Sequence, residues 1–203
     1  MNRVLVYLFV FSALDLTVFA RAQEAPAALR QIDFSAFGAF TSASTGLSGG
    51  HNTDVTAGFD LNLPSLSLFR PGLEARATYP FEHDGIDRQH DIVAGPRLEL
   101  NFTRLHPYAD FLVGSGRINY GDSRQGYVTY RGVEITGYSN STIYSPGIGA
   151  SFDFSPHIAA FADLQMQHWD TPVSLSGHLL AKPFSIGLKY RFGVPGHAHN
   201  TNF

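Results

Sequence analysis

Hydrophobic and polar residues alternate along most of this chain with a period of two. In the segment 54–64, for example, Val55, Phe59 and Leu63 share one face, and polar or small residues occupy the other. This is the period of a β-strand, whose successive side chains point to opposite faces, and it differs from the 3.6-residue period of a helix. The fifth such segment is the least regular, because Leu112 interrupts its polar face. The eight segments with this pattern are 31–43, 54–64, 71–81, 91–102, 108–120, 142–154, 158–169 and 182–192.

The links between these segments alternate in length. The links after the second, fourth and sixth segments are short: 65–70, 103–107 and 155–157. The others are longer: 44–53, 82–90, 121–141 and 170–181. An even number of strands of about ten residues, with short turns at one end and long loops at the other, is typical of bacterial outer-membrane barrels. We therefore predict an all-β fold, an eight-stranded antiparallel up-and-down transmembrane β-barrel with short periplasmic turns and longer extracellular loops. A soluble β-sandwich would also alternate and is the competing fold.

The polar face has an unusual composition for a face that meets water. It is rich in Gly, Ser, Asn and Thr and carries a few charges of both signs. In a membrane barrel these residues would fill the lumen, where unpaired charge is costly, so we predict that they pair. The predicted lumen charge network consists of Asp60, Glu74, Arg76, Arg97, Glu99, Asp110, Asp153, Asp163, Lys189 and Arg191. Because side chains fill the interior of an eight-stranded barrel, we expect no passage for sizeable solutes.

Aromatic residues gather near both ends of the predicted strands. Those near the short turns are Phe102, Phe152, Phe154, Tyr190 and Phe192. Those near the long loops are Tyr79, Phe81, Tyr120, Tyr144 and Trp169. Two aromatic belts that flank smaller aliphatic residues are typical of strands that cross both interfaces of a membrane, although clustered core aromatics would give a similar pattern.

The first residues have the organisation of a secretory signal peptide. Arg3 precedes an apolar run at 4–13, and Ala20 and Ala22 place small residues before a cleavage point. The run is shorter than the roughly 20 residues that a membrane-spanning helix needs. The predicted organisation is a signal peptide at 1–22, an N-terminal periplasmic segment at 23–30, the barrel at 31–192 and a short C-terminal tail at 193–203.

Composition narrows the class of protein further. Of 203 residues, 15% are charged, against roughly one quarter in an ordinary soluble domain. The chain has no Cys, which excludes disulfides and thiolate sites. The net charge of −3 gives no basic surface for nucleic acid, so no nucleic-acid partner is expected.

The final strand carries a resemblance to a known family. Its residues 185–192, SIGLKYRF, are similar to the C-terminal β-signal of outer-membrane proteins, with Ser185, Gly187, Tyr190 and Phe192 at the motif positions. In architecture, residues 31–192 resemble the small eight-stranded outer-membrane barrels, such as the OmpA transmembrane domain, OmpX and the opacity proteins. The resemblance implies contact with outer-membrane lipid and lipopolysaccharide, insertion by the barrel-assembly machinery through the last strand, and a monomer. Many members end at the terminal Phe, whereas here the tail 193–203 follows, too short to be a periplasmic peptidoglycan-binding domain.

The leading interpretation is a structural or surface-interaction (adhesion-like) protein that acts through its extracellular loops. The longest loop, 121–141, holds Tyr127, Tyr130, Arg131 and Tyr138, residue types common in recognition surfaces. Part of the same loop has strand character and would alternatively form a protruding hairpin.

No catalytic residue, cofactor or metal site is predicted. His168 and Asp170 end the seventh segment, and Ser174, Ser176 and His178 are expected in the loop that follows. Similar barrels include lipid-A deacylases and palmitoyl transferases, but the His-x-Ser order on a strand with a downstream acid, which would match the deacylases, is absent here. A lipid-A-modifying enzyme is therefore the alternative function, and an exported soluble ligand-binding β-barrel is the third.

The remaining histidines give weaker signals. His197 and His199 in the tail lack a third metal ligand. His83, His90, His106 and His157 fall in or beside predicted turns and are expected to be solvated.

Overall fold

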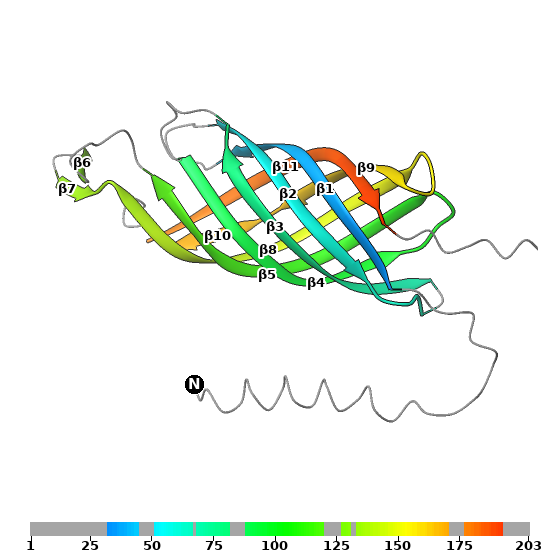
Figure 1. Cartoon of the computed structure of the whole chain (residues 1–203). Coiled ribbons are helices and arrows are strands. Elements are labelled where there is room, and N and C mark those ends of the chain that lie inside the picture. Colours follow the sequence, from blue (N-terminus) through cyan, green and yellow to red (C-terminus); the bar gives the residue numbers. More distant parts are fainter. Residues whose placement is uncertain are drawn as a thin grey trace, which may run out of the picture. The chain divides into compact units, whose positions relative to one another are not determined.

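The alternating segments form antiparallel strands in the computed structural model (Figure 1). The structure describes residues 32–44, 51–66, 68–81, 88–119, 127–130, 133–170 and 177–192. The strands are β1 (Asp33–Ser44), β2 (His51–Asn62), β3 (Phe69–Pro80), β4 (Arg88–Leu100), β5 (Leu105–Asn119), β6 (Tyr127–Tyr130), β7 (Val133–Thr136), β8 (Tyr138–Asp153), β9 (Ile158–Gln165), β10 (Gln167–Asp170) and β11 (His178–Arg191). Among these residues no helix has the length and hydrophobicity needed to cross a membrane. The predicted segments 1–22, 23–30 and 193–203 lie outside the described residues.

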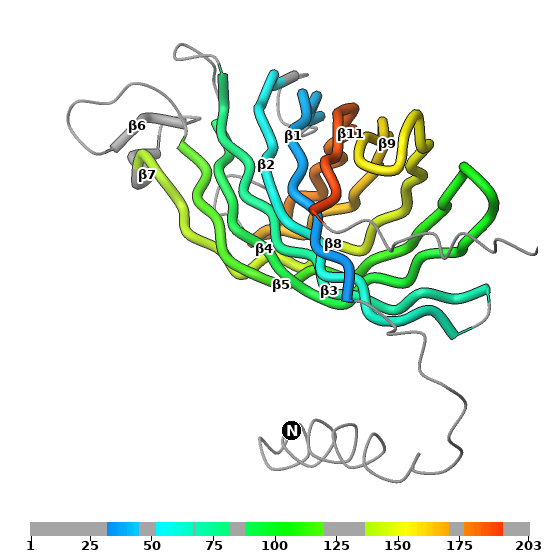
Figure 2. Tube along the Cα trace, turned by 45° about the vertical axis from the view of Figure 1, so that its right-hand side comes forward, coloured from blue at the N-terminus to red at the C-terminus, as the bar shows by residue number. Residues whose placement is uncertain are grey.

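Consecutive strands pair around a closed barrel. β9 and β10 are two parts of one strand, interrupted at Met166, and both lie between β8 and β11. The Met166 N–H still donates to the Pro146 carbonyl at 2.9 Å, which keeps the two parts in line. β1 pairs with β11, so the first and last strands lie side by side (Figure 2). With β9 and β10 counted together, the predicted eight-stranded antiparallel up-and-down barrel is confirmed.

Several strands extend further toward the long loops than the sequence pattern predicted. β2 begins at His51 rather than at residue 54, β8 at Tyr138 rather than at 142, and β11 at His178 rather than at 182. At this end both faces of β2 and β8 carry polar residues and both faces of β11 carry leucine, so the alternation that marks a strand fades there. The backbone ladder nevertheless continues, because it depends on N–H and C=O groups and not on side-chain polarity.

The long loop between β5 and β8 contains strand structure of its own. β6 and β7 pair antiparallel from Tyr127↔Thr136 to Tyr130↔Val133 and form a separate two-stranded sheet. Part of the longest loop is therefore a hairpin, as its strand character indicated.

The two faces of the barrel wall have opposite chemistry. Large apolar side chains such as Phe59, Ile148 and Leu188 point outward and are exposed, whereas most of the buried side chains are polar or charged. β5 keeps strict alternation, with Leu112 inside and Arg117 outside. The barrel thus reverses the usual arrangement of a soluble protein, in which the apolar face forms the core.

Candidate functional site

A glycine on the inner face of β8 gives space to the polar centre of the lumen. A Cβ atom at Gly147 would lie 2.0 Å from Gln165 Nε2, so only glycine lets the Gln165 side chain cross at this point. Gln165 Nε2 donates to Asp110 Oδ1 at 3.0 Å and to Asp163 Oδ1 at 3.1 Å. The Tyr108 hydroxyl donates to Asp163 Oδ2 at 3.1 Å. Two carboxylates from the strands that flank β8, Asp110 on β5 and Asp163 on β9, thereby accept hydrogen bonds from neutral donors.

Arg97 is the most connected cation of the lumen. Its Nη1 lies 2.9 Å from Asp60 Oδ2 and 3.1 Å from Glu74 Oε2, and its Nη2 donates to Glu99 Oε2 at 3.1 Å. The guanidinium carbon also lies 3.6 Å from the centroid of the Tyr108 ring, a cation–π contact. The side chain is 1% exposed, so its charge is balanced almost entirely by these neighbours.

The other two central cations complete the neutralisation. Arg76 pairs with Glu74, and its Nη1 lies 2.6 Å from Asp163 Oδ1. Lys189, on β11, pairs with Asp60, on β2. It approaches Asp60 from the side away from β3. Carboxylates and cations alternate across the lumen, which is the arrangement that buried charges need.

A second group of charges lies near the short turns. Arg191 Nη1 lies 2.5 Å from Asp153 Oδ2, which also meets His106 Nε2 at 3.0 Å. Arg70 Nη2 lies 3.3 Å from Asp33 Oδ2. The remaining links are longer: Arg70 to Glu99 at 3.9 Å, His106 to Glu99 at 4.0 Å and Arg191 to Asp33 at 4.0 Å. The structure thus places all ten residues of the predicted lumen charge network in the interior and joins them into one continuous set.

Three further residues join the ten predicted ones, and sequence reasoning missed them: Asp33, Arg70 and His106. The expectation that His106 is solvated was wrong, because β5 begins at Leu105 and turns the His106 side chain inward, 9% exposed. Arg70 fell within the predicted turn 65–70, but β3 already begins at Phe69. Asp33 shares the parity of the inward-facing Ser35, and that signal would have identified it.

An apolar cluster fills the lumen toward the long loops. It consists of Val93, Leu112, Ile118, Ile143, Trp169, Leu179 and Ala181. Placing Trp169 in the outer aromatic belt was wrong: it is 0% exposed, and its Nε1–H donates to Gln167 Oε1 at 3.1 Å inside the barrel. The reason is parity, since Trp169 follows Gln165 and Gln167 on the inward face.

The other described residues of the two predicted aromatic belts point outward. They are Phe102, Phe152, Phe154, Tyr190 and Phe192 near the short turns, and Tyr79, Phe81 and Tyr144 near the long loops. Tyr120 lies outside the described residues.

Hydroxyl groups form a ladder across four neighbouring strands, β11, β1, β2 and β3. Thr56 Oγ1 lies 2.7 Å from Thr41 Oγ1 and 3.1 Å from Thr78 Oγ1. Thr41 also meets Ser185 Oγ at 2.8 Å, which links β1 to β11. These short polar side chains satisfy one another in the narrow interior.

We predict that Thr56→Val lowers the free energy of unfolding by about 1–2 kcal/mol, because two buried hydroxyl groups lose a partner. Thr53→Val is the matched control, since Thr53 points outward on the same strand and is exposed; there we expect a change within about 0.5 kcal/mol. Urea unfolding of the barrel in lipid vesicles measures both, and equal effects would contradict the ladder's role.

The four predicted β-signal residues lie on the strand that closes the barrel. Ser185 and Gly187 face inward, and Tyr190 and Phe192 are exposed on the outside. A Cβ atom at Gly187 would lie 2.1 Å from the Gly38 carbonyl oxygen of β1, so glycine permits close pairing at this seam.

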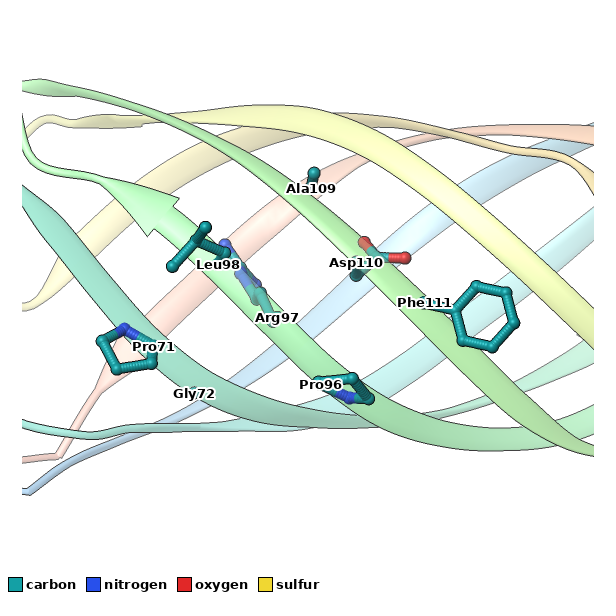
Figure 3. A pocket seen from close by; sticks show the side chains of 8 residues that line it. All are labelled: Pro71, Gly72, Pro96, Arg97, Leu98, Ala109, Asp110 and Phe111. Atoms are coloured by element: carbon teal, nitrogen blue, oxygen red, sulfur yellow. The ribbon is translucent and has the colours of Figure 1, made fainter. Parts of the chain in front are cut away.

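A shallow hollow of about 470 Å³ lies on the wall formed by β3, β4 and β5 (Figure 3). It is lined by Pro71, Gly72, Pro96, Arg97, Leu98, Ala109, Asp110 and Phe111. Pro96 has no N–H to donate, and the ladder between β4 and β5 passes from Ala94↔Val113 directly to Arg97↔Asp110. Its lining is mostly apolar, because Arg97 and Asp110 direct their charges into the lumen.

The outer rim brings together the polar residues that suggested enzyme chemistry. His178 lies in β11 and not in a loop, directly opposite Asp170, and its Nδ1 is 2.8 Å from Asp170 Oδ1. The His168 ring lies beside it, with ring centroids 4.9 Å apart. Ser174 and Ser176 lie outside the described residues.

No protein-family profile and no curated protein matches this chain. Among solved structures it is similar to neisserial surface protein A (NspA), with 13% identity, coverage of 83% of this chain and 100% of that chain, and a TM-score of 0.49. It is also similar to Ail, the attachment invasion locus protein of Yersinia pestis, in complex with the heparin analogue sucrose octasulfate. The identity is 14%, the match covers 79% of this chain and 97% of that chain, and the TM-score is 0.48. The outer membrane enzyme PagL is 15% identical, the match covers 80% of this chain and 99% of that chain, and the TM-score is 0.39. These likenesses are distant, and the eight-stranded barrel architecture rests on the strand pairing described above.

Proposed function

We propose that this protein is an integral barrel of a bacterial outer membrane, with a side-chain-filled lumen, and that it acts at the cell surface through its long loops as a structural or adhesion-like protein. One observation carries the proposal: the barrel exposes its apolar face and buries its charged face. In water such a surface would be an aggregation liability, whereas in lipid it is the stable arrangement.

The filled lumen supports a structural or binding role over transport. Charged groups around Arg97 cross the centre, and the apolar cluster around Trp169 occupies the part toward the long loops. The same filling argues against an exported soluble barrel that holds a ligand inside, since such barrels keep an open cavity.

The proposed partners follow from the two surfaces. Outer-membrane lipid and lipopolysaccharide would contact the outward apolar side chains, and the hollow beside Pro96 suits a hydrocarbon chain. The last strand, with Ser185, Gly187, Tyr190 and Phe192, would engage the barrel-assembly machinery. We propose a monomer that does not bind nucleic acid.

Cell fractionation tests the proposal directly. We expect the protein in the outer-membrane fraction, and we expect its migration on a detergent gel to change on heating, because a closed barrel resists detergent until it is boiled. A protein recovered in full from the soluble periplasm would contradict it.

Planar-bilayer recordings test the filled lumen separately. We expect the purified barrel to give no large, stable openings, because the paired charges around Arg97 obstruct the interior. Large, stable, ion-permeable openings would contradict this part of the proposal. They would not contradict the proposed membrane location.

A lipid-A-modifying enzyme is the second candidate function, and the hydrogen bond between His178 and Asp170 at the rim favours it, since a histidine oriented by a carboxylate is a common general base. Mass spectra of lipid A from cells with and without the protein would differ in acyl chains if it acts there. Unchanged spectra would leave the structural role.

A further inference from the structure

We propose that His168, Asp170 and His178 form a binding site for a divalent transition-metal ion of the zinc type on the outer rim of the barrel. The ligand atoms of these three side chains all lie within 4.8 Å of one another. Two imidazole nitrogens and one carboxylate oxygen are a ligand set that zinc accepts, and sites with three protein ligands leave a fourth position for water. The proposal is independent of the function proposed above.

The pairing of β10 with β11 brings the three residues together. His168 and Asp170 are two residues apart on β10 and therefore project from the same face of the strand. His178 is the direct cross-strand partner of Asp170, and His168 pairs with Leu180, the next outward residue of β11. The set is thus fixed by the register of two strands, which position ligands more precisely than a loop does.

The backbone at Asp170 is held by the neighbouring strand. The Asp170 N–H donates to Ser141 Oγ at 2.8 Å, and Ser139 Oγ donates to the Asp170 carbonyl oxygen at 3.4 Å. β10 is therefore anchored to β8 on one side and to β11 on the other. The Cα positions of the ligands should change little when a metal binds.

The side chains need a small adjustment to reach coordination distances. Ligand atoms on a tetrahedral zinc ion lie about 3.3–3.6 Å apart, given metal–ligand bonds of about 2.0–2.2 Å. His178 Nδ1 and Asp170 Oδ1 are already closer than this, at 2.8 Å. The His178 and Asp170 side chains are 57% and 67% exposed, so they can rotate at little cost and an ion can enter from outside.

The outward residues around His168, Asp170 and His178 support a role for these three side chains as metal ligands and not merely as part of a solvated polar surface. Below the rim the outward residues of the same two strands are apolar at Leu164, Met166 and Phe184, with Lys182 as the charged exception. Among the described residues, the group placed against the His178 ring is a second imidazole, that of His168. Two imidazoles and a carboxylate that converge in this way are better suited to share a cation than to transfer a proton.

The experiment is zinc titration of the full barrel by calorimetry, purified without a polyhistidine tag and folded in detergent micelles. We expect one Zn²⁺ per chain, with affinity reduced at least about tenfold in each of His168→Ala, Asp170→Asn and His178→Ala, because each removes a ligand. His157→Ala is the matched control, since His157 is an exposed histidine at the opposite end of the barrel and should leave binding unchanged. Heat-modifiable gel migration verifies that each variant is folded.

Two further measurements keep the proposal falsifiable. In a His197→Ala/His199→Ala variant, zinc binding should persist, and its loss would assign the ion to the tail and overturn the proposal. Electron paramagnetic resonance of Cu²⁺ added to the unaltered protein should show hyperfine coupling from two nitrogens. No binding at 1 mM Zn²⁺, an affinity in His168→Ala and His178→Ala equal to that of the unaltered protein, or a copper signal without paired nitrogens would each overturn it.

Discussion

Replacing Arg97 by alanine is expected to lower the free energy of unfolding of the barrel by about 3–5 kcal/mol, the usual cost of removing one partner from a buried ion network. Arg97 contacts Asp60, Glu74 and Glu99, and all three carboxylates are buried. Without the guanidinium these groups repel one another or must take up protons. The Tyr108 ring also loses its cation–π partner.

Two variants give this prediction its controls. Arg97→Lys keeps the charge but not the planar fork that reaches several carboxylates, so it should cost less than alanine. Arg117→Ala removes an exposed arginine whose Nε donates to Asn140, and we expect it to change stability by less than about 1 kcal/mol. Reversible urea unfolding in vesicles, followed by gel migration, compares all three. A loss at Arg97 no larger than that at Arg117 would show that the network does not stabilise the barrel.

Ile148→Arg is expected to lower the free energy of unfolding by about 2–4 kcal/mol when the barrel is in a bilayer. This is the penalty for a charge that faces lipid near the midplane. Ile148 is 63% exposed on the outside of β8, midway between Tyr144 and Phe152, which belong to the two aromatic belts. On a soluble barrel the same exposed position would accept arginine at little cost. The prediction therefore tests the membrane environment and not only the fold.

The matched control is Thr142→Arg, on the same face of the same strand but beyond the Tyr144 belt. We expect a cost of about 0–1 kcal/mol there, since the penalty falls toward the interface. Unfolding measured in vesicles of a defined phospholipid gives both values. Equal effects at positions 148 and 142 would contradict the proposed placement of the barrel in the bilayer.

The strands and their faces were predictable because one physical signal determines both. The barrel wall is a single sheet whose outer face is apolar and whose inner face is polar. Hydrophobic and polar residues must therefore alternate along each strand, as they do clearly in segments 54–64 and 182–192. The same parity places Trp169 inside, and grouping it with other aromatics by type obscured this. The strand ends were less predictable, because backbone pairing continues at His51 and Tyr138 after the apolar pattern has ended.

The candidate sites were predictable only in part, because they depend on which strands become neighbours. The lumen charges followed from their inward parity, but Arg70 and His106 were missed because they stand at strand ends. The rim cluster needed the register that sets His178 opposite Asp170. The sequence placed His178 in a loop, and cross-strand register is set by pairing that the sequence pattern does not specify.

The seam between β1 and β11 has a consequence for biogenesis. Thr41 and Ser185, which meet at this seam, are separated by 144 positions in the chain. Until the last strand has been synthesised, a nascent sheet must leave the hydrogen-bonding edge of β1 open, and open edges recruit other strands into aggregates. Long-range pairings of this kind also form slowly. A truncation that removes β11 should therefore produce aggregated material and not a smaller barrel.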